Sequence, residues 1–337
     1  MIAIAPDSFK GSIGAAAAAE AIAAGWRSVR PDDELLVVPQ ADGGEGSLDA
    51  LARAVPGAVR HPVLAVTGPD GRPVDAYWLQ LPDGAAAVEL AVSSGLPLMA
   101  APDPMGATTR GLGEVLAAAL DAGATRLIVA LGGSASTDGG RGALEALGWP
   151  RSLRPAPPGG VVLLSDVTAP LLGTTGAAAV FAPQKGATNA QVAELEARLS
   201  AFAALLGGDP GAPGAGAAGG TAFGLGTVWG ARISSGADYI AELTGVHSQP
   251  ADVLVTGEGR FDAQSLGGKV VGQLLARATG RTVVIAGSLD ATPPDLGISL
   301  TELAGGRAAA MAEPAHWLTI AGAEAAQRFR PVARLSH

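Results

Sequence analysis

The chain has 337 residues, with 22 basic and 31 acidic side chains and a net charge of −9. This length predicts two domains, since a domain typically spans roughly 100–200 residues. An acidic chain without a basic face is not expected to bind nucleic acid. We also expect no membrane partner, because the apolar stretch 14–26 contains Glu20 and is shorter than the ~20 residues of a membrane span.

Cysteine is absent from the sequence, which excludes disulfides, thiol nucleophiles and thiolate metal sites. Residues 1–6 contain no basic region ahead of an apolar one, so we expect no signal peptide. Both features predict a cytoplasmic protein. The four histidines are scattered outside the glycine-rich loops, and we therefore expect neither a histidine-based triad nor a histidine metal site.

The N-terminal segment alternates short apolar runs with helical segments. We expect strands at 2–5 and 35–38, a helix capped by Ser12 that ends at Arg30, and a second helix from Ser47 to about residue 56. Strand, loop and helix thus occur twice in about 55 residues, and this pattern is typical of a parallel sheet.

The middle of the chain has a different pattern. Alternating runs at 59–66, 74–81 and 85–90, separated by turn residues, predict an antiparallel meander. Beyond it we expect helices at 110–122, up to Gly148 and at 189–206, strands at 126–131, 161–165 and 177–181, and a loop at 207–220.

The C-terminal segment returns to strand, loop and helix. The expected elements are strands at 252–256 and 282–286 and helices at 268–279 and from about 313 to 328. The prediction is therefore an α/β protein of two domains. Residues 1–57 and 236–337 would form a discontinuous, doubly wound, Rossmann-like domain with a mostly parallel sheet, and residues 58–235 an inserted mixed α/β domain.

Five loops that follow predicted strands contain acids, hydroxyls or lysine, and all but 165–168 combine them with glycine: 6–12, 41–46, 132–140, 165–168 and 256–262. Ligands of open parallel sheets bind beyond the carboxyl ends of the strands. Glycines let the backbone approach a phosphate, and a helix N-terminus adds free N–H groups. Carboxylates in such loops hold Mg²⁺ or accept a proton. The alternative for each loop is an ordinary tight turn.

Lysine is rare, and each of the three lysines lies beside a glycine: Lys10, Lys185 and Lys269. A compact ammonium and a bulky guanidinium are not interchangeable at a crowded anion site. Together with the loops, this pattern predicts an enzyme that handles a phosphorylated, anionic ligand with Mg²⁺. The sequence Gly-x-Gly-x-x-Gly at 214–219 does not follow a strand, so a nicotinamide site is not expected.

The loops, in chain order and together with segments 183–187 and 214–220, resemble the bacterial type I glycerate kinases, the glycerate 2-kinase family. The likeness extends over nearly the whole chain, although the segment 149–160 is shorter than in the family. The resemblance implies phosphorylation of D-glycerate by ATP, commonly at the 2-hydroxyl group. It also implies two α/β domains with the active site between them.

For this reaction, Asp166 or Asp42 is expected to accept the hydroxyl proton, with Asp138 and Asp7 as the next choices. Lys10 and Lys185 would neutralise phosphate or carboxylate, and Glu258 and Asp262 would hold Mg²⁺. The other expected substrate- or phosphate-binding residues are Asp7, Ser8, Gly43, Gly44, Gly132, Gly133, Ser134, Asp138 and Lys269.

Two other functions stay open: a kinase of the same fold for another small hydroxy acid, and a catalytically inactive homologue that only binds ligand. The expected partners are D-glycerate and ATP. The sequence leaves open phosphorylation at O2 or O3, the domain that holds adenine, and whether the protein is a homo-oligomer.

Overall fold

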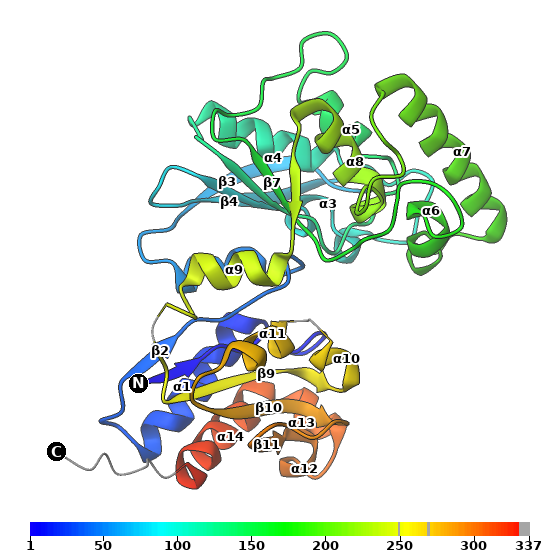
Figure 1. Cartoon of the computed structure of the whole chain (residues 1–337). Helices are drawn as coiled ribbons and strands as arrows, with labels where there is room; N and C mark the ends of the chain where they lie inside the picture. Colours follow the sequence, from blue (N-terminus) through cyan, green and yellow to red (C-terminus); the bar gives the residue numbers. More distant parts are fainter. Residues whose placement is uncertain (249, 268–269, 330–337) are drawn as a thin grey trace. The chain divides into compact units, whose positions relative to one another are not determined.

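The structure is a computed structural model that describes residues 1–248, 250–267 and 270–329. The chain forms two compact units. Unit 1 consists of Met1–Ala41, Asp49–Ala54 and the chain from Ile240 onwards, and unit 2 of Asp42–Leu48 and Val55–Tyr239. Each unit has its own β-sheet with helices packed on it (Figure 1), which confirms the predicted α/β class.

The described part of unit 1 contains a five-stranded parallel sheet in the order β11-β10-β9-β1-β2. Its strands are β1 (Ile2–Ile4), β2 (Leu35–Val37), β9 (Val253–Phe261), β10 (Arg281–Leu289) and β11 (Leu296–Ser299). β1 pairs with β2 on one side and with β9 on the other, so the chain winds outward in both directions from β1. This is the doubly wound arrangement that the sequence predicts.

Both faces of this sheet are covered, because successive side chains of a strand point to opposite faces. In β10, Val283 and Ile285 pack with helices α1 and α14, whereas Val284 and Ala286 pack with α11. The helices with residues in unit 1 are α1 (Ala15–Val29), α2 (Ser47–Ala54), α9 (Gly236–Thr244), α10 (Ala263–Leu266), α11 (Val270–Arg277), α12 (Leu300–Leu303), α13 (Arg307–Ala312) and α14 (Pro314–Arg328).

Helices α1 and α14 approach each other closely at two glycines. A Cβ atom on Gly25 would lie 1.9 Å from the carbonyl oxygen of Thr319, and one on Gly322 would lie 2.3 Å from that of Ile22. Beside this crossing, Trp26 is fully buried and donates a hydrogen bond from Nε1 to Asp33 at 2.9 Å. The absence of two side chains thus allows the backbones of the first and last helices to pack together.

Unit 2, all of whose residues are described, has a six-stranded sheet in the order β3-β4-β5-β6-β7-β8. β3 to β5 are antiparallel, as the predicted meander requires, and β5 to β8 are parallel. The strands are β3 (Val59–Thr67), β4 (Pro73–Gln80), β5 (Ala86–Glu89), β6 (Leu127–Ala130), β7 (Val161–Leu164) and β8 (Arg232–Ser234).

The core of unit 2 joins this sheet to helices packed on it. Leu116 of α4 and Phe202 of α7, for example, belong to the same buried cluster as Val129 of β6. The helices are α3 (Ala91–Ser94), α4 (Arg110–Asp121), α5 (Arg141–Ala146), α6 (Ala177–Phe181), α7 (Asn189–Leu206) and α8 (Ala217–Trp229), with 3-10 turns at Leu96–Leu98 and Pro183–Lys185.

Three local predictions are wrong. The expected strand at 177–181 is helix α6, since a short apolar run does not discriminate strand from helix and alanine favours helix. The expected loop at 256–262 largely continues β9, which pairs with β10 as far as Phe261. Helix α1 is preceded by Gly14 rather than capped by Ser12. The predicted loop at 207–220, in contrast, is confirmed, because residues 218–220 still have left-handed backbone angles and the regular part of α8 follows them.

No helix in the described ranges has both the length and the apolar character that crossing a bilayer requires.

Candidate active site

Three segments of unit 2 lie against one another at the carboxyl ends of β6 and β7. The N–H of Gly132 donates to the oxygen of Gly43 at 3.0 Å, and a Cβ on Gly132 would lie 2.4 Å from the Cα of Gly44. A Cβ on Gly236 would lie 1.9 Å from the oxygen of Asp42. Glycine is therefore required at 132 and 236, and the predicted residues Asp42, Gly43, Gly44 and Gly132 come together.

Asp166 and Asp42 form an acidic pair in this region. Asp166 is exposed to solvent and accepts a hydrogen bond from the N–H of Gly236 at 3.3 Å. Desolvation by the surrounding atoms raises the pKa of Asp166 above its usual value, the hydroxyl of Ser235 lowers it, and the charge of Asp42 raises it again. A carboxylate with a raised pKa is better suited to accept a proton near neutral pH.

The carboxylate of Asp42 also shapes its own loop, because its Oδ1 accepts a hydrogen bond from the N–H of Gly44 at 2.9 Å. The same segment is held further along by Glu89, which is 2 % exposed at the end of β5. The two carboxylate oxygens of Glu89 accept from the N–H groups of Gly46 and Leu48, both at 3.0 Å. Glu89 is thus a buried support of the loop at 41–46.

Lys185 is buried in unit 2, with 4 % of its surface exposed. It ends the 3-10 turn Pro183–Lys185, and its Nζ donates a hydrogen bond to the main-chain oxygen of Ser136. Burial lowers the pKa of Lys185 to about 8, and the negative charge of Asp138 opposes this shift. The side chain is therefore still mainly a cation at neutral pH.

A cavity of about 150 Å³ lies beside Lys185. The predicted residues Gly132, Gly133 and Ser134 line it, and so does Gly219 at the start of α8. A Cβ on Gly219 would lie 2.1 Å from the oxygen of Ser136, so glycine is needed for that oxygen to keep its position beside Lys185.

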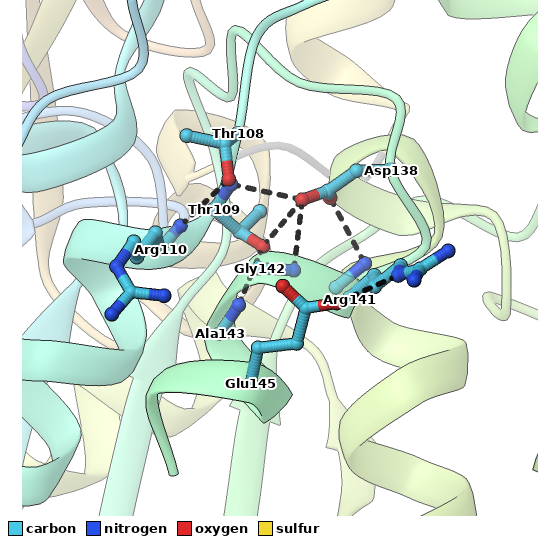
Figure 2. Close-up of polar contacts among 9 residues, drawn as sticks. Thr108, Thr109, Arg110, Asp138, Arg141, Gly142, Ala143 and Glu145 are labelled. Carbon is cyan, nitrogen blue, oxygen red and sulfur yellow. Dashed lines mark hydrogen bonds and ion pairs between the residues drawn. The ribbon is translucent and has the colours of Figure 1, made fainter. Parts of the chain in front are cut away.

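Asp138 lies close by, but its carboxylate is engaged in holding the backbone (Figure 2). Its Oδ2 accepts from the N–H of Thr109 at 2.9 Å, from the hydroxyl of Thr109 at 2.8 Å and from the N–H of Gly142 at 3.2 Å. Its Oδ1 accepts from the N–H of Gly140 at 3.0 Å. Four donors on one carboxylate indicate a residue that positions the loop 132–140.

Thr109 extends this network into α5, since its hydroxyl oxygen accepts a hydrogen bond from the N–H of Ala143 at 3.0 Å (Figure 2). The side chain of Arg141 pairs with Glu145 at 2.8 Å, and both of these side chains are exposed (Figure 2). Asp138 and Thr109 therefore join the N-terminal ends of α4 and α5.

The remaining predicted residues belong to unit 1, where the loop after β1 lies along β9. The N–H of Asp7 donates to the oxygen of Gly257 at 2.8 Å, and the carboxylate of Asp7 accepts from the N–H of Ser8 at 2.6 Å. Lys10 is exposed, and a Cβ on Gly259 would lie 3.5 Å from its backbone nitrogen. Asp7, Ser8 and Lys10 are thus near Glu258, which lies on β9 between these glycines.

Asp262 caps the helix α10. Its Oδ1 accepts from the N–H groups of Gln264 at 2.8 Å and Ser265 at 3.3 Å, and its Oδ2 lies 3.6 Å from Arg260. Within residues 1–248, 250–267 and 270–329, no three His, Asp or Glu side chains are grouped so as to hold a metal ion. These residues do not fit a cation that is bound by protein groups alone. They fit Mg²⁺ that is carried on phosphates, because such an ion needs only one or two carboxylates from the protein. Lys269 lies outside the described residues.

Glu89, Thr109 and Ser235 were not among the predicted site residues. The glutamate ending the buried run Ala86–Glu89 was a usable signal, because a charged residue in such a run needs hydrogen-bond partners. Thr109 and Ser235 act through partners distant in the sequence, which local patterns do not show.

Comparison with known proteins places this arrangement in a class. A model of the glycerate kinase family matches residues 2–155 and 152–330. Glycerate 2-kinase of Escherichia coli is 39% identical, covering 86% of this chain and 85% of its own. Glycerate kinase of Bacillus subtilis is 42% identical over 80% of this chain and 79% of its own.

A solved structure gives the same result. The crystal structure of a glycerate kinase 2 from Salmonella typhimurium LT2 superimposes with a TM-score of 0.79, at 33% identity and with 97% of each chain covered. The protein is a kinase with an α/β fold of two sheets. It belongs to the glycerate kinase family.

Proposed function

We propose that this chain transfers the terminal phosphoryl group of ATP to the 2-hydroxyl group of D-glycerate, giving 2-phosphoglycerate and ADP. The family supports glycerate as the acceptor, and the name of the E. coli relative supports position 2. The observation that carries the proposal is Asp166, a carboxylate with a raised pKa in a loop beyond a parallel strand.

In the proposed reaction, Asp166 takes the proton from the 2-hydroxyl group. The hydroxyl oxygen bonds to the terminal phosphorus of ATP, the bond from that phosphorus to its bridging oxygen breaks, and ADP leaves with the electron pair. Positioning and charge neutralisation account for most catalysis in phosphoryl transfer. Lys10 and Lys185 supply positive charge, and Asp42 holds its loop in place beside Asp166.

When bound with ATP, Mg²⁺ would supply positive charge against the phosphate oxygens. Glu258 and Asp262 are the proposed protein ligands, directly or through water. Of the two, Asp262 already uses its oxygens to cap α10 and to approach Arg260. We therefore assign the larger share of metal binding to Glu258.

Phosphorus NMR of the product made from ATP, Mg²⁺ and D-glycerate tests the proposal directly. A resonance split by the single proton on C2 identifies 2-phosphoglycerate, whereas splitting by the two protons on C3 identifies the 3-isomer and overturns the position. A panel of acceptors followed by ADP release tests the substrate. Faster turnover of another small hydroxy acid would favour a kinase of the same fold that acts on that acid. No turnover of any acceptor would favour a catalytically inactive homologue.

A further inference from the structure

The positive charge of Lys185 is buried, and few protein groups are in direct contact with it to replace the lost water. Taking an ammonium out of water is costly unless hydrogen bonds and an opposite charge replace the water. An ammonium has three N–H donors, and the Nζ of Lys185 uses one of them on the oxygen of Ser136. Across the described residues, no carboxylate lies within 4.0 Å of this Nζ, so the cation has room for an anionic ligand.

The surroundings of Lys185 favour a small polar ligand. Ser134, Ser165 and Gln184 line the cavity with polar side chains, while Gly133 and Gly219 leave backbone open to it. Ser134 also donates to the oxygen of Ser136 at 3.4 Å, so the same carbonyl group holds both Ser134 and Lys185. The ammonium is therefore fixed at the wall of a cavity built from several elements of unit 2.

The size of the cavity restricts the ligand. Pockets that enclose drug-sized molecules measure roughly 300–1,000 Å³, whereas this one measures about 150 Å³. At about 30 Å³ for each water molecule, it holds on the order of five waters. A three-carbon acid or a single phosphate group fits such a space, whereas a whole nucleotide does not. A single buried cation also matches the single charge of a carboxylate.

We propose that the Lys185 cavity binds the carboxylate of the acceptor acid and thereby selects small 2-hydroxy acids over uncharged alcohols. The inference rests on the proposed function, because it assigns this cavity to the acceptor and leaves the phosphates of ATP to other residues. It predicts that Lys185 governs affinity for the acid and has little influence on affinity for the nucleotide.

The test is calorimetric titration of wild type and Lys185→Met with D-glycerate, and separately with ADP and Mg²⁺. A hydrogen bond to a charged group contributes about 1.5–3 kcal/mol. We therefore expect the Kd for D-glycerate to rise about 10- to 100-fold in Lys185→Met and the Kd for ADP to change less than about threefold. Glycerol should bind weakly to both proteins, with no difference between them.

Arg198→Met is the matched control, since it removes the same charge from the exposed side of α7, where Arg198 pairs with Glu194. Its affinity for D-glycerate should equal that of wild type. Circular dichroism and a melting curve show whether Lys185→Met folds, and folding is expected because a buried cation is replaced by an apolar chain of similar length. Should the variant not fold, Lys185→Gln takes its place in the titration.

Two results overturn the inference. One is an unchanged Kd for D-glycerate in the folded variant, and the other is a loss confined to ADP, which would make the cavity a phosphate site. Neither result concerns the proposed function, which the phosphorus NMR of wild type tests independently. If wild type makes no phosphoglycerate, the function fails, and the titration with D-glycerate still decides whether Lys185 binds a carboxylate.

Discussion

Lys185 donates a hydrogen bond from its Nζ to the main-chain oxygen of Ser136, and both residues are buried. Ser136 precedes Asp138 by two residues, so the position of the ammonium depends on the loop that Asp138 holds. The charge of Lys185, its support and the carboxylate that moderates its pKa thus belong to one structural unit. Changes in this loop should therefore affect both the position and the protonation of the Lys185 side chain.

The first prediction concerns pH. Because burial lowers the pKa of Lys185 to about 8, the ammonium loses its proton as the pH rises through this value. We expect kcat/KM for D-glycerate to fall above about pH 8, since this ratio reports the free enzyme. The residual activity of Lys185→Arg should be at least tenfold lower and lack this alkaline decrease, because a guanidinium stays protonated. A wild-type profile that is flat to pH 9.5 would contradict the prediction.

The stability of the fold has the opposite dependence on pH. The folded protein holds the Lys185 proton less tightly than the unfolded chain, whose lysine pKa is 10.5. The unfolded state therefore binds more protons between about pH 8 and 10.5, and the burial of this group opposes folding less and less as the pH rises through that range. Urea unfolding of wild type and Lys185→Met gives the free energy of unfolding of each protein. The effect of Lys185 is the change, between pH 7 and 10, in the difference between these two free energies.

The second prediction concerns Asp138. Its carboxylate accepts four hydrogen bonds, and an asparagine offers one acceptor oxygen and places an NH₂ donor against N–H groups. We expect Asp138→Asn to destabilise the protein by about 1–3 kcal/mol, given the cost of unmade hydrogen bonds in a half-buried network. The measurement is the free energy of unfolding in urea.

Glu145→Gln is the control for Asp138, because it removes a neighbouring carboxylate that only forms an exposed pair with Arg141. Such pairs contribute about 0–1 kcal/mol, so this variant should resemble wild type. Equal stability of Asp138→Asn and wild type would mean that the network of Figure 2 does not hold the loop.

The third prediction concerns the contact of α1 with α14. Gly25→Ala places a Cβ 1.9 Å from the oxygen of Thr319, so the helices must separate. Overpacking of this kind costs about 1–3 kcal/mol. Gly14→Ala is the control, since nothing lies within 4 Å of its added Cβ. Melting curves compare the two, and equal loss in both would show that the crossing is not responsible.

Much of the fold follows from patterns that the sequence contains. The alternation at 59–66 and 74–81 determines the antiparallel strands β3 and β4, and the apolar run at 161–165 determines β7. Where prediction fails, tertiary pairing decides. Gly257 and Gly259 are typical of a loop, yet β9 continues through them because β10 supplies hydrogen-bond partners and the glycines admit close neighbours. The local sequence around Gly257 does not reveal that β10 will pair with this segment.

The candidate site shows the same limit. The sequence shows the segments with Asp42, Asp166 and Lys185 as short polar loops, two of them with glycine, and the structure brings them together in unit 2. The sequence does not distinguish an acid that has solvent on one side from an acid saturated with hydrogen bonds. Asp166 and Asp138 both follow strands in unit 2, but the rest of the fold supplies four donors to Asp138 and leaves Asp166 exposed.

The last prediction separates Asp166 from Asp42. A general base contributes roughly 10²- to 10⁴-fold. Asp166→Asn should therefore lower kcat by that factor with a modest change in the KM for D-glycerate. Asp42→Asn should instead raise the KM for ATP or the Mg²⁺ requirement, because the Asp42 carboxylate shapes the loop through Gly44. Steady-state kinetics of both variants across a Mg²⁺ titration measure these effects.

The pH profile sharpens this comparison. The charge of Asp42 contributes to the raised pKa of Asp166. Removing that charge in Asp42→Asn should move the acidic limb of kcat/KM to lower pH, since the proton leaves Asp166 more readily. Asp238→Asn also removes a charge that raises this pKa, but as the last of the causes, so its shift should be smaller. Asp166 would be excluded as the base if the acidic limb did not move in either variant and Asp166→Asn retained its kcat. Asp7 would then be the next choice, because hydrogen bonds already occupy both carboxylate oxygens of Asp138.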